Sequence, residues 1–171
     1  IVFVSVLKDK ANKEISLEVQ DWLVKPVDET RVLRSINAAI GQKKERPVVL
    51  AIDDDRDTVK LLTTMVERAG YTAETAYDGQ EAIDKINSYK PDLIILDIMM
   101  PGLDGFQVVS LLKENSWTKH IPVLVLTAKD LNPLEKKTLH LGMTKFLTKS
   151  YATHGKIMRS VAELLYTAVG R

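Results

Sequence analysis

Asp97 is the residue of this chain whose surroundings most suggest chemistry. It ends the apolar run Leu93–Leu96 and precedes a turn that contains Pro101 and Gly102. An acid in that position lies at the carboxyl end of a strand buried on both faces, which is where open α/β sheets hold their ligands. A turn-forming aspartate would give the same local pattern. The ends of the neighbouring strands therefore decide between the two interpretations.

Polar side chains also end three other apolar runs of this region. The first run is followed directly by Asp53 and Asp54, a later run ends in Thr127, and the last one ends in Lys149. The carboxyl ends of parallel strands meet at one edge of a sheet. We therefore expect these side chains to share a single mouth with Asp97.

The residue types at this mouth indicate phosphoryl chemistry. Crowded carboxylates disfavour their own ionisation unless a cation lies between them. An oxygen-rich, thiol-free cluster suits a hard divalent ion, so we expect Asp53, Asp54 and Asp97 to hold Mg²⁺. Lys149 adds a movable positive charge suited to phosphate, and Thr127 adds a hydroxyl donor. Together they favour the attachment of a phosphoryl group to Asp97, which would act as the nucleophile and form an aspartyl-phosphate.

Each residue of this cluster also has a simpler explanation. Asp55 is better explained as the N-cap of the helix that follows it, and Asp53 and Asp54 singly fit capping or solvated positions. Thr127 alone fits a β-branched strand residue, and Lys149 alone fits a surface lysine. It is their combination at successive strand ends that favours a phosphoryl site.

The composition is that of an ordinary globular protein, with 45% hydrophobic and 27% charged residues. A net charge of +1 gives no reason to expect a nucleic acid or an anionic membrane as a direct partner. No apolar run approaches the ~20 residues of a membrane span. The absence of cysteine excludes disulfides and thiolate metal sites and is compatible with a reducing compartment, so we expect a cytoplasmic protein. The chain begins with Ile, as a piece of a longer protein would.

Short apolar runs alternate with longer amphipathic ones from residue 47 onward. The pattern predicts strands at 48–52, 72–76, 93–96, 122–126 and 145–148. It predicts helices at 58–69, from 79 through 86, and at 106–113, 133–141 and 154–168. Strands and helices that alternate in this way form a parallel sheet covered on both faces, a doubly wound α/β fold. Four methionines are expected to be ordinary apolar packing: Met99, Met100, Met143 and Met158.

The segment 47–169 resembles the receiver domain of bacterial two-component response regulators. The resemblance rests on the acidic run that follows the first strand, on Asp-Ile-Met-Met-Pro-Gly beginning at Asp97, on Leu-Thr-Ala around Thr127, and on Lys149. It implies a flavodoxin-like sheet of five parallel strands in the order 2-1-3-4-5. It also implies that the domain is a signalling module and not an enzyme, apart from its own phosphorylation and dephosphorylation.

The resemblance also assigns roles to individual residues. In that family the aspartate takes its phosphoryl group from a histidine of a sensor kinase or of a phosphotransfer protein, and this role falls to Asp97. The acidic pair that organises Mg²⁺ corresponds to Asp53 and Asp54. The backbone-carbonyl ligand of the metal, two residues after the nucleophile, corresponds to Met99.

The switch residues and one departure follow from the same resemblance. Thr127 corresponds to the hydroxyl that moves onto the phosphoryl group, and Phe146 to the aromatic side chain that swings inward with it. Phosphorylation would thereby shift a protein-interaction face between two arrangements. The family usually places proline after its lysine, whereas Lys149 is followed by Ser150, which makes a cis peptide there costly by ~3 kcal/mol.

The first 40 residues repeat part of this plan. Ser5 ends an apolar run, and Lys25 follows another one 20 residues later. The corresponding interval from Thr127 to Lys149 is 22 residues. Any other βαβα unit would show a similar alternation, but the matched hydroxyl and lysine positions favour duplication.

The expected organisation therefore has three parts. Residues 1–40 form a partial βαβα unit, the C-terminal half of a second receiver-like domain. Residues 41–46 form a short polar linker. Residues 47–169 form the complete receiver domain.

Three functions are compatible with these residues to different degrees. The favoured one is a phosphoacceptor switch that receives its phosphoryl group from a histidine kinase or a histidine phosphotransfer protein. The alternative is a receiver-like module that is never phosphorylated and acts in protein interaction or dimerisation, within a hybrid sensor kinase or a multi-receiver regulator. An aspartate-nucleophile phosphatase is disfavoured, because those enzymes carry an acid where this chain has Met99. A homodimer is compatible with either of the first two functions.

Overall fold

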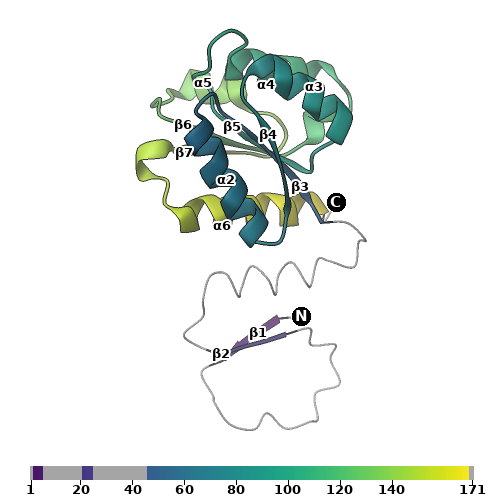
Figure 1. Cartoon of the computed structure of the whole chain (residues 1–171), viewed down its shortest axis with the longest axis vertical. Coiled ribbons are helices and arrows are strands. Elements are labelled where there is room, and N and C mark those ends of the chain that lie inside the picture. The colour runs from purple at the N-terminus through teal and green to yellow at the C-terminus, as the bar shows by residue number, and fades with distance from the viewer. Residues whose placement is uncertain (1, 6–20, 25–45, 170–171) are drawn as a thin grey trace. The chain divides into compact units, whose positions relative to one another are not determined.

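The computed structural model describes residues 2–5, 21–24 and 46–169 (Figure 1). The chain divides into two compact units, residues 1–46 and 47–171, and each is described by itself. In the first unit two short strands, β1 (Val2–Ser5) and β2 (Asp21–Val24), pair in parallel. The helices expected in this unit lie outside the described residues, as does most of the expected linker. Two paired strands do not identify half of a receiver domain, which therefore stays a prediction.

The second unit contains a five-stranded parallel sheet in the order β4-β3-β5-β6-β7. Its strands are β3 (Val48–Ile52), β4 (Thr72–Ala76), β5 (Leu93–Leu96), β6 (Val123–Thr127) and β7 (Thr144–Thr148). Numbered within this unit, the order is 2-1-3-4-5, so the predicted sheet is confirmed.

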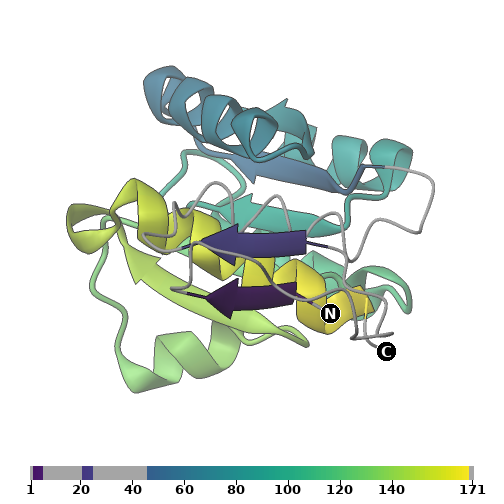
Figure 2. The ribbon, with the colours of Figure 1, turned by 90° about the horizontal axis from the view of Figure 1, so that it is seen from below.

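Helices follow the strands in alternation and cover both faces of the sheet (Figure 1). The α-helices are α2 (Arg56–Arg68), α3 (Gly79–Tyr89), α4 (Gly105–Glu114), α5 (Pro133–Leu139) and α6 (His154–Val169). Two short 3-10 helices are η1 (Thr118–His120) and η2 (Lys149–Tyr151). Figure 2 shows α6 lying across one face of the sheet. None of the described helices is long and apolar enough to cross a membrane.

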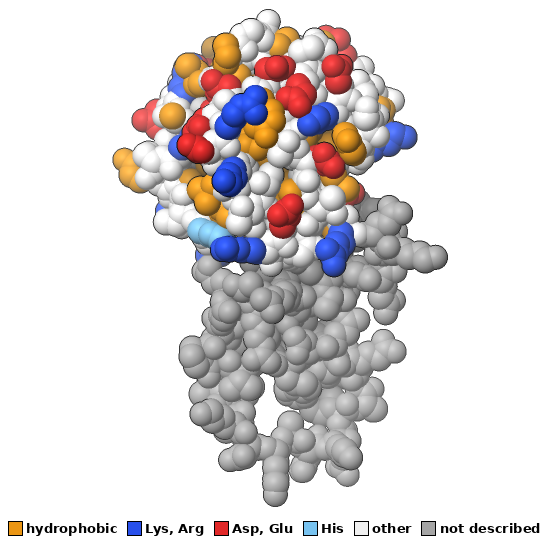
Figure 3. All heavy atoms as spheres, viewed as in Figure 1, with side chains coloured by type: hydrophobic (Ala, Val, Ile, Leu, Met, Phe, Trp, Pro, Cys, Tyr) orange, Lys and Arg blue, Asp and Glu red, His pale blue; other side chains and the backbone are white. Residues whose placement is uncertain are grey.

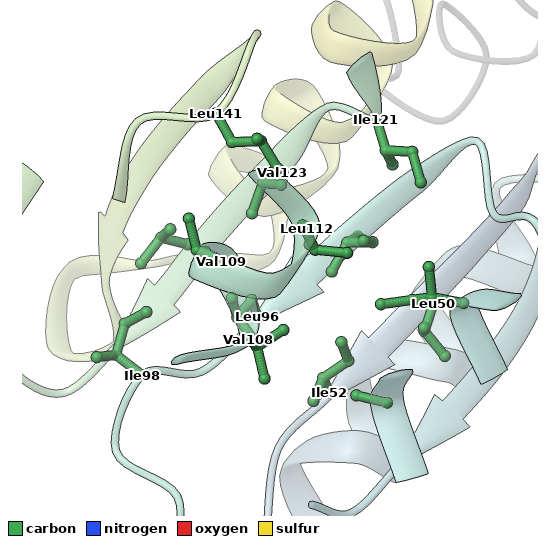
Figure 4. Close-up of a cluster of buried hydrophobic side chains, with 14 of the residues drawn as sticks. Leu50, Ile52, Leu96, Ile98, Val108, Val109, Leu112, Ile121, Val123 and Leu141 are labelled. Carbon is green, nitrogen blue, oxygen red and sulfur yellow. The ribbon is translucent and has the colours of Figure 1, made fainter. Parts of the chain in front are cut away.

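A cluster of buried hydrophobic side chains packs the sheet against α3 and α4. Every residue of β5 is buried, as expected for a central parallel strand. Figure 4 shows Leu50 and Ile52 of β3, and Leu96 of β5, near the α4 side chains Val108 and Leu112. Close packing of this core holds the strands of the sheet in fixed positions.

Capping side chains set the helix boundaries. Asp55 accepts a hydrogen bond from the backbone of Asp57, so α2 begins at Arg56, two residues before the predicted start. The prediction that Asp55 is an N-cap is confirmed. At the C-terminal end of α5, the backbone of His140 is extended. The helix therefore ends at Leu139, and not at residue 141 as predicted.

Candidate phosphoryl-acceptor site

The register of β3 and β5 brings two carboxylates together. Ile52 is paired with Leu96, and the backbone N–H of Asp97 donates to the Ile52 carbonyl at 2.9 Å. The next residue of each strand therefore emerges at the same edge. Asp53 and Asp97 are 1% and 5% exposed, so both acids are removed from most of the surrounding water.

Lys149 completes the centre of the site and comes from the end of β7, the edge strand of the sheet. The register pairs Thr127 with Thr148, so that Lys149 follows β7 at the same edge. Its Nζ atom lies 2.6 Å from Oδ2 of Asp53 and 2.7 Å from Oδ2 of Asp97. Strand ends that are far apart in the sequence thus meet as the strand pattern predicts.

Backbone donors orient the other oxygen of each carboxylate. Oδ1 of Asp97 accepts from the N–H groups of Ile98, at 2.6 Å, and Met99, at 3.2 Å. Oδ1 of Asp53 accepts from the N–H of Asp55 at 3.1 Å. Every oxygen of these two buried carboxylates therefore has a hydrogen-bond donor, which fixes the orientation of both side chains.

The turn after Asp97 is built around two glycines. Gly102 has a φ of +75°, a conformation that side-chain-bearing residues rarely adopt. A Cβ atom on Gly105 would lie 2.6 Å from the carbonyl oxygen of Asp97 and 2.7 Å from Cα of Ile98. Only glycine allows α4 to begin this close to the backbone of Asp97.

Burial and ion pairing have opposing effects on the charges of the site. Burial raises the pKa of Asp53 above its ordinary value, although the hydrogen bonds from Lys149 and Asp55 act to lower it. For Lys149, burial acts to lower the pKa, but the hydrogen bonds to Asp53 and Asp97 outweigh it and raise the pKa. The ammonium is therefore held in its charged form, while the negative charge of Asp53 is incompletely compensated.

The acids also have the arrangement that a metal ion requires. Asp53, Asp54 and Asp97 each offer an oxygen, and these three oxygens lie within 4.8 Å of one another. Asp54 is exposed, so the group is open to solvent on one side. Hard carboxylate donors in a thiol-free site, one of them with a pKa raised by burial, suit a hard divalent cation.

Thr127 and Phe146 lie where the sequence places them in the sheet. Thr127 is 2% exposed, and its hydroxyl oxygen accepts a hydrogen bond from the backbone N–H of Lys129 at 3.3 Å. Phe146 is half-buried on β7 and packs against the hydrophobic core. Their roles as switch residues stay predictions, since geometry in one state does not demonstrate movement.

The ion pair of Lys129 was not predicted from the sequence, and the burial of Met99 was predicted wrongly. Lys129 Nζ pairs with Oε1 of Glu135 at 2.6 Å and lies over the ring of Phe106 at 5.6 Å. The Asn132–Glu135 capping box was the available signal, because it places Glu135 at the start of α5. Met99 is 58% exposed, so the prediction that it is ordinary apolar packing is wrong. The strand β5 ends three residues earlier, at Leu96, and the turn that follows carries residue 99 out of the core.

Comparison with known proteins agrees with this geometry. The profile of the response regulator receiver domain family matches residues 49–161. The alkaline phosphatase synthesis transcriptional regulatory protein PhoP of Bacillus subtilis is 41% identical over 104 residues, which are 61% of this chain and 42% of that protein. The chain thus spans less than half the length of this curated relative.

Solved structures show the same fold. Chemotaxis protein CheY4 of Vibrio cholerae is 31% identical with a TM-score of 0.64, over 70% of this chain and 98% of its own. The receiver domain of a sensor histidine kinase from Pseudomonas aeruginosa is 21% identical with a TM-score of 0.63, over 71% and 98%. That structure has a magnesium ion coordinated in its active site cleft. On the family match, this chain belongs to the response regulator receiver domain family, the phosphoacceptor modules of two-component signalling.

Proposed function

We propose that Asp97 is the phosphoacceptor and that its phosphoryl group comes from a phosphohistidine of a histidine kinase or a histidine phosphotransfer protein. The observation that carries this proposal is the position of Lys149 Nζ, 2.7 Å from Asp97 and 2.6 Å from Asp53. A structural ion pair would need one acid, whereas this ammonium is shared by two buried ones. Such an arrangement keeps a mobile positive charge beside a potential nucleophile.

The transfer would be an in-line displacement at phosphorus. An oxygen of the Asp97 carboxylate forms the new P–O bond while the P–N bond to the donor imidazole breaks, and the imidazole leaves with the electron pair of that bond. The N–H groups of Ile98 and Met99 hold the carboxylate in orientation from one side. Lys149 can follow the charge from the carboxylate to the phosphoryl oxygens.

The metal of the proposed site is Mg²⁺. Asp53, Asp54 and Asp97 would hold it through carboxylate oxygens, and Met99 would add its backbone carbonyl. When bound, Mg²⁺ would neutralise the negative charge that the phosphoryl group brings to the carboxylates. The magnesium coordinated in the receiver domain from Pseudomonas aeruginosa supports this assignment by analogy.

The proposed output is a change in protein interaction. Thr127 would move its hydroxyl toward the phosphoryl group, and Phe146 would follow from its half-buried position. The loop between β6 and α5 is held by the ion pair of Lys129 with Glu135, and the N–H of Lys129 donates to the Thr127 hydroxyl oxygen. Movement of Thr127 would therefore displace the start of α5.

The wider setting of the domain is also a proposal. The domain boundaries at 1–40, 41–46 and 47–169, with a half receiver first, rest on the matched hydroxyl and lysine positions; parallel pairing of β1 with β2 is compatible with them. A hybrid kinase or multi-receiver parent, a cytoplasmic location and a homodimer fit such a module. Charges of both signs are interspersed on the face in Figure 3. That the domain contacts neither nucleic acid nor membrane directly is part of this proposal.

The decisive experiment measures phosphoryl uptake. The protein is incubated with acetyl phosphate and Mg²⁺, and the mass shift of the phosphorylated form is followed in the wild type, in Asp97→Asn and in Asp130→Asn. Asp130 is an exposed acid beyond β6 and serves as the matched control. Uptake that is lost only in Asp97→Asn supports the proposal. No uptake by the wild type would favour the interaction module that is never phosphorylated.

A further inference from the structure

Met99 differs from the other methionines in its exposure. Its side chain is 58% exposed, whereas Met65 and Met158 are each 2% exposed and Met100 is 6% exposed. Met143 is half-buried. The chain has five methionines and no cysteine, so the thioether of Met99 is the sulfur that a small oxidant in solution reaches most readily.

We propose that Met99 is a site of reversible oxidation by peroxides, and that its sulfoxide shortens the lifetime of a phosphoryl group on Asp97. In the reaction with hydrogen peroxide, a sulfur lone pair attacks one peroxide oxygen and an S–O bond forms as the O–O bond breaks. The proton on the transferred oxygen passes to the departing oxygen, which leaves as water. The sulfur is oxidised by two electrons and the peroxide is reduced.

The position of residue 99 makes such a change felt at the nucleophile. The backbone N–H of Met99 donates to Oδ1 of Asp97 at 3.2 Å. The turn that carries it is closed by a hydrogen bond from the N–H of Gly105 to the carbonyl of Ile98 at 3.1 Å. These two hydrogen bonds hold the backbone of residue 99 next to the Asp97 carboxylate, so a chemical change in its side chain occurs close to the acceptor.

The direction of the effect follows from the polarity of the two forms. The thioether is apolar and accepts hydrogen bonds only weakly, so it holds few water molecules near the carboxylates. The sulfoxide is polar, and its oxygen accepts hydrogen bonds from water. Hydrolysis of an aspartyl-phosphate needs a water molecule beside Asp97. We expect the sulfoxide to make hydrolysis of the aspartyl-phosphate about threefold faster. This inference rests on the proposed function, phosphorylation of Asp97.

The test compares three states of one preparation. The full chain is studied reduced, after treatment with hydrogen peroxide, and after repair by the two methionine sulfoxide reductases. Peptide mass spectrometry gives the order in which the five methionines oxidise. The lifetime of the phosphoryl group is measured after acetyl phosphate is removed. Met99→Leu and Met143→Leu receive the same treatment.

The inference requires Met99 to oxidise first, hydrolysis to accelerate, and repair to restore the original lifetime. In Met99→Leu peroxide should leave the lifetime at that variant's own starting value, whereas Met143→Leu should respond like the wild type. Oxidation of another methionine ahead of Met99, or an unchanged lifetime in the Met99 sulfoxide, would overturn the inference alone. Failure of the reduced wild type to take up phosphate would instead overturn the proposed function, and the regulation with it.

Discussion

Lys149 lies 2.7 Å from Asp97, although 52 residues separate them in the chain. The contact exists because β5 and β7 flank β6 and end at the same edge of the sheet. Asp53 reaches the same ammonium from β3 on the other side of β5. One cation therefore joins three strand ends, and several properties of the protein depend on it.

Removing this charge should impair phosphoryl uptake more than it impairs the fold. In Lys149→Gln we expect the rate of uptake from acetyl phosphate to fall by about 100-fold, as when one preorganised group that stabilises transition-state charge is lost. The rate is measured by the mass of the intact protein against time. Lys145→Gln is the matched control, because Lys145 lies in β7, the strand that Lys149 follows, and pairs with Glu163 away from the site. Equal rates in the two variants would contradict the role of Lys149.

Neutralising Asp53 should stabilise the metal-free protein. Burial raises the pKa of Asp53, so the contribution of this group to stability is fully present below its ordinary pKa of 3.8 and is lost as the pH rises through the raised value. At pH 7 we expect Asp53→Asn to have a Tm higher by about 3 °C. The difference should vanish below pH 3.8, where the wild-type carboxyl is also neutral. A lower Tm for the variant at pH 7 would show that the ion pair with Lys149 outweighs burial.

The same variant separates stability from metal binding. Adding Mg²⁺ should raise the Tm of the wild type, because a ligand that binds only the folded state stabilises it. In Asp53→Asn the rise should be much smaller, since one buried ligand has lost its charge. Thermal unfolding with and without Mg²⁺ measures both values, and an equal rise in the two proteins would exclude Asp53 as a ligand.

Two glycines of the turn should respond differently to alanine. Gly105→Ala places a Cβ 2.6 Å from the carbonyl of Asp97, and we expect it to lower the free energy of unfolding by about 3 kcal/mol and to slow phosphoryl uptake. Gly102→Ala meets no atom within 4 Å and has only its φ of +75° to accommodate, which should cost about 1 kcal/mol. Urea unfolding ranks the two variants. The reverse order would mean that the turn relaxes easily around Asp97.

Lys90 offers a stabilising substitution. Among the described residues it is the one non-glycine with a positive φ, at 48°, and it forms the left-handed C-cap of α3. Lys90→Gly should raise the free energy of unfolding by about 1 kcal/mol, because glycine adopts this conformation without a Cβ penalty. Lys136→Gly, inside α5, should have the opposite effect of about the same size. Urea denaturation measures both. A destabilised Lys90→Gly would show that the side chain contributes more than its backbone conformation costs.

The sequence alone predicted the five-stranded sheet and the three strand-end residues that the structure brings together. Short continuous apolar runs such as Leu93–Leu96 are typical of buried strands, and their alternation with amphipathic segments predicts a parallel sheet. Asp53, Asp97 and Lys149 were found because each one ends such a run. These features are local: they depend on the order of residues within about ten positions, which a sequence shows directly.

Only the tertiary structure decided how those residues meet and what surrounds them. That Lys149 is shared by two acids depends on the register of four strands, which no local pattern specifies. The ion pair of Lys129 with Glu135 joins a loop to the helix after it. The exposure of Met99 depends on the path of its turn, where side-chain hydrophobicity does not determine burial. Each of these features is determined by packing between different segments of the chain. The free energy of such packing depends on many residues at once, so it leaves no periodic pattern in the sequence.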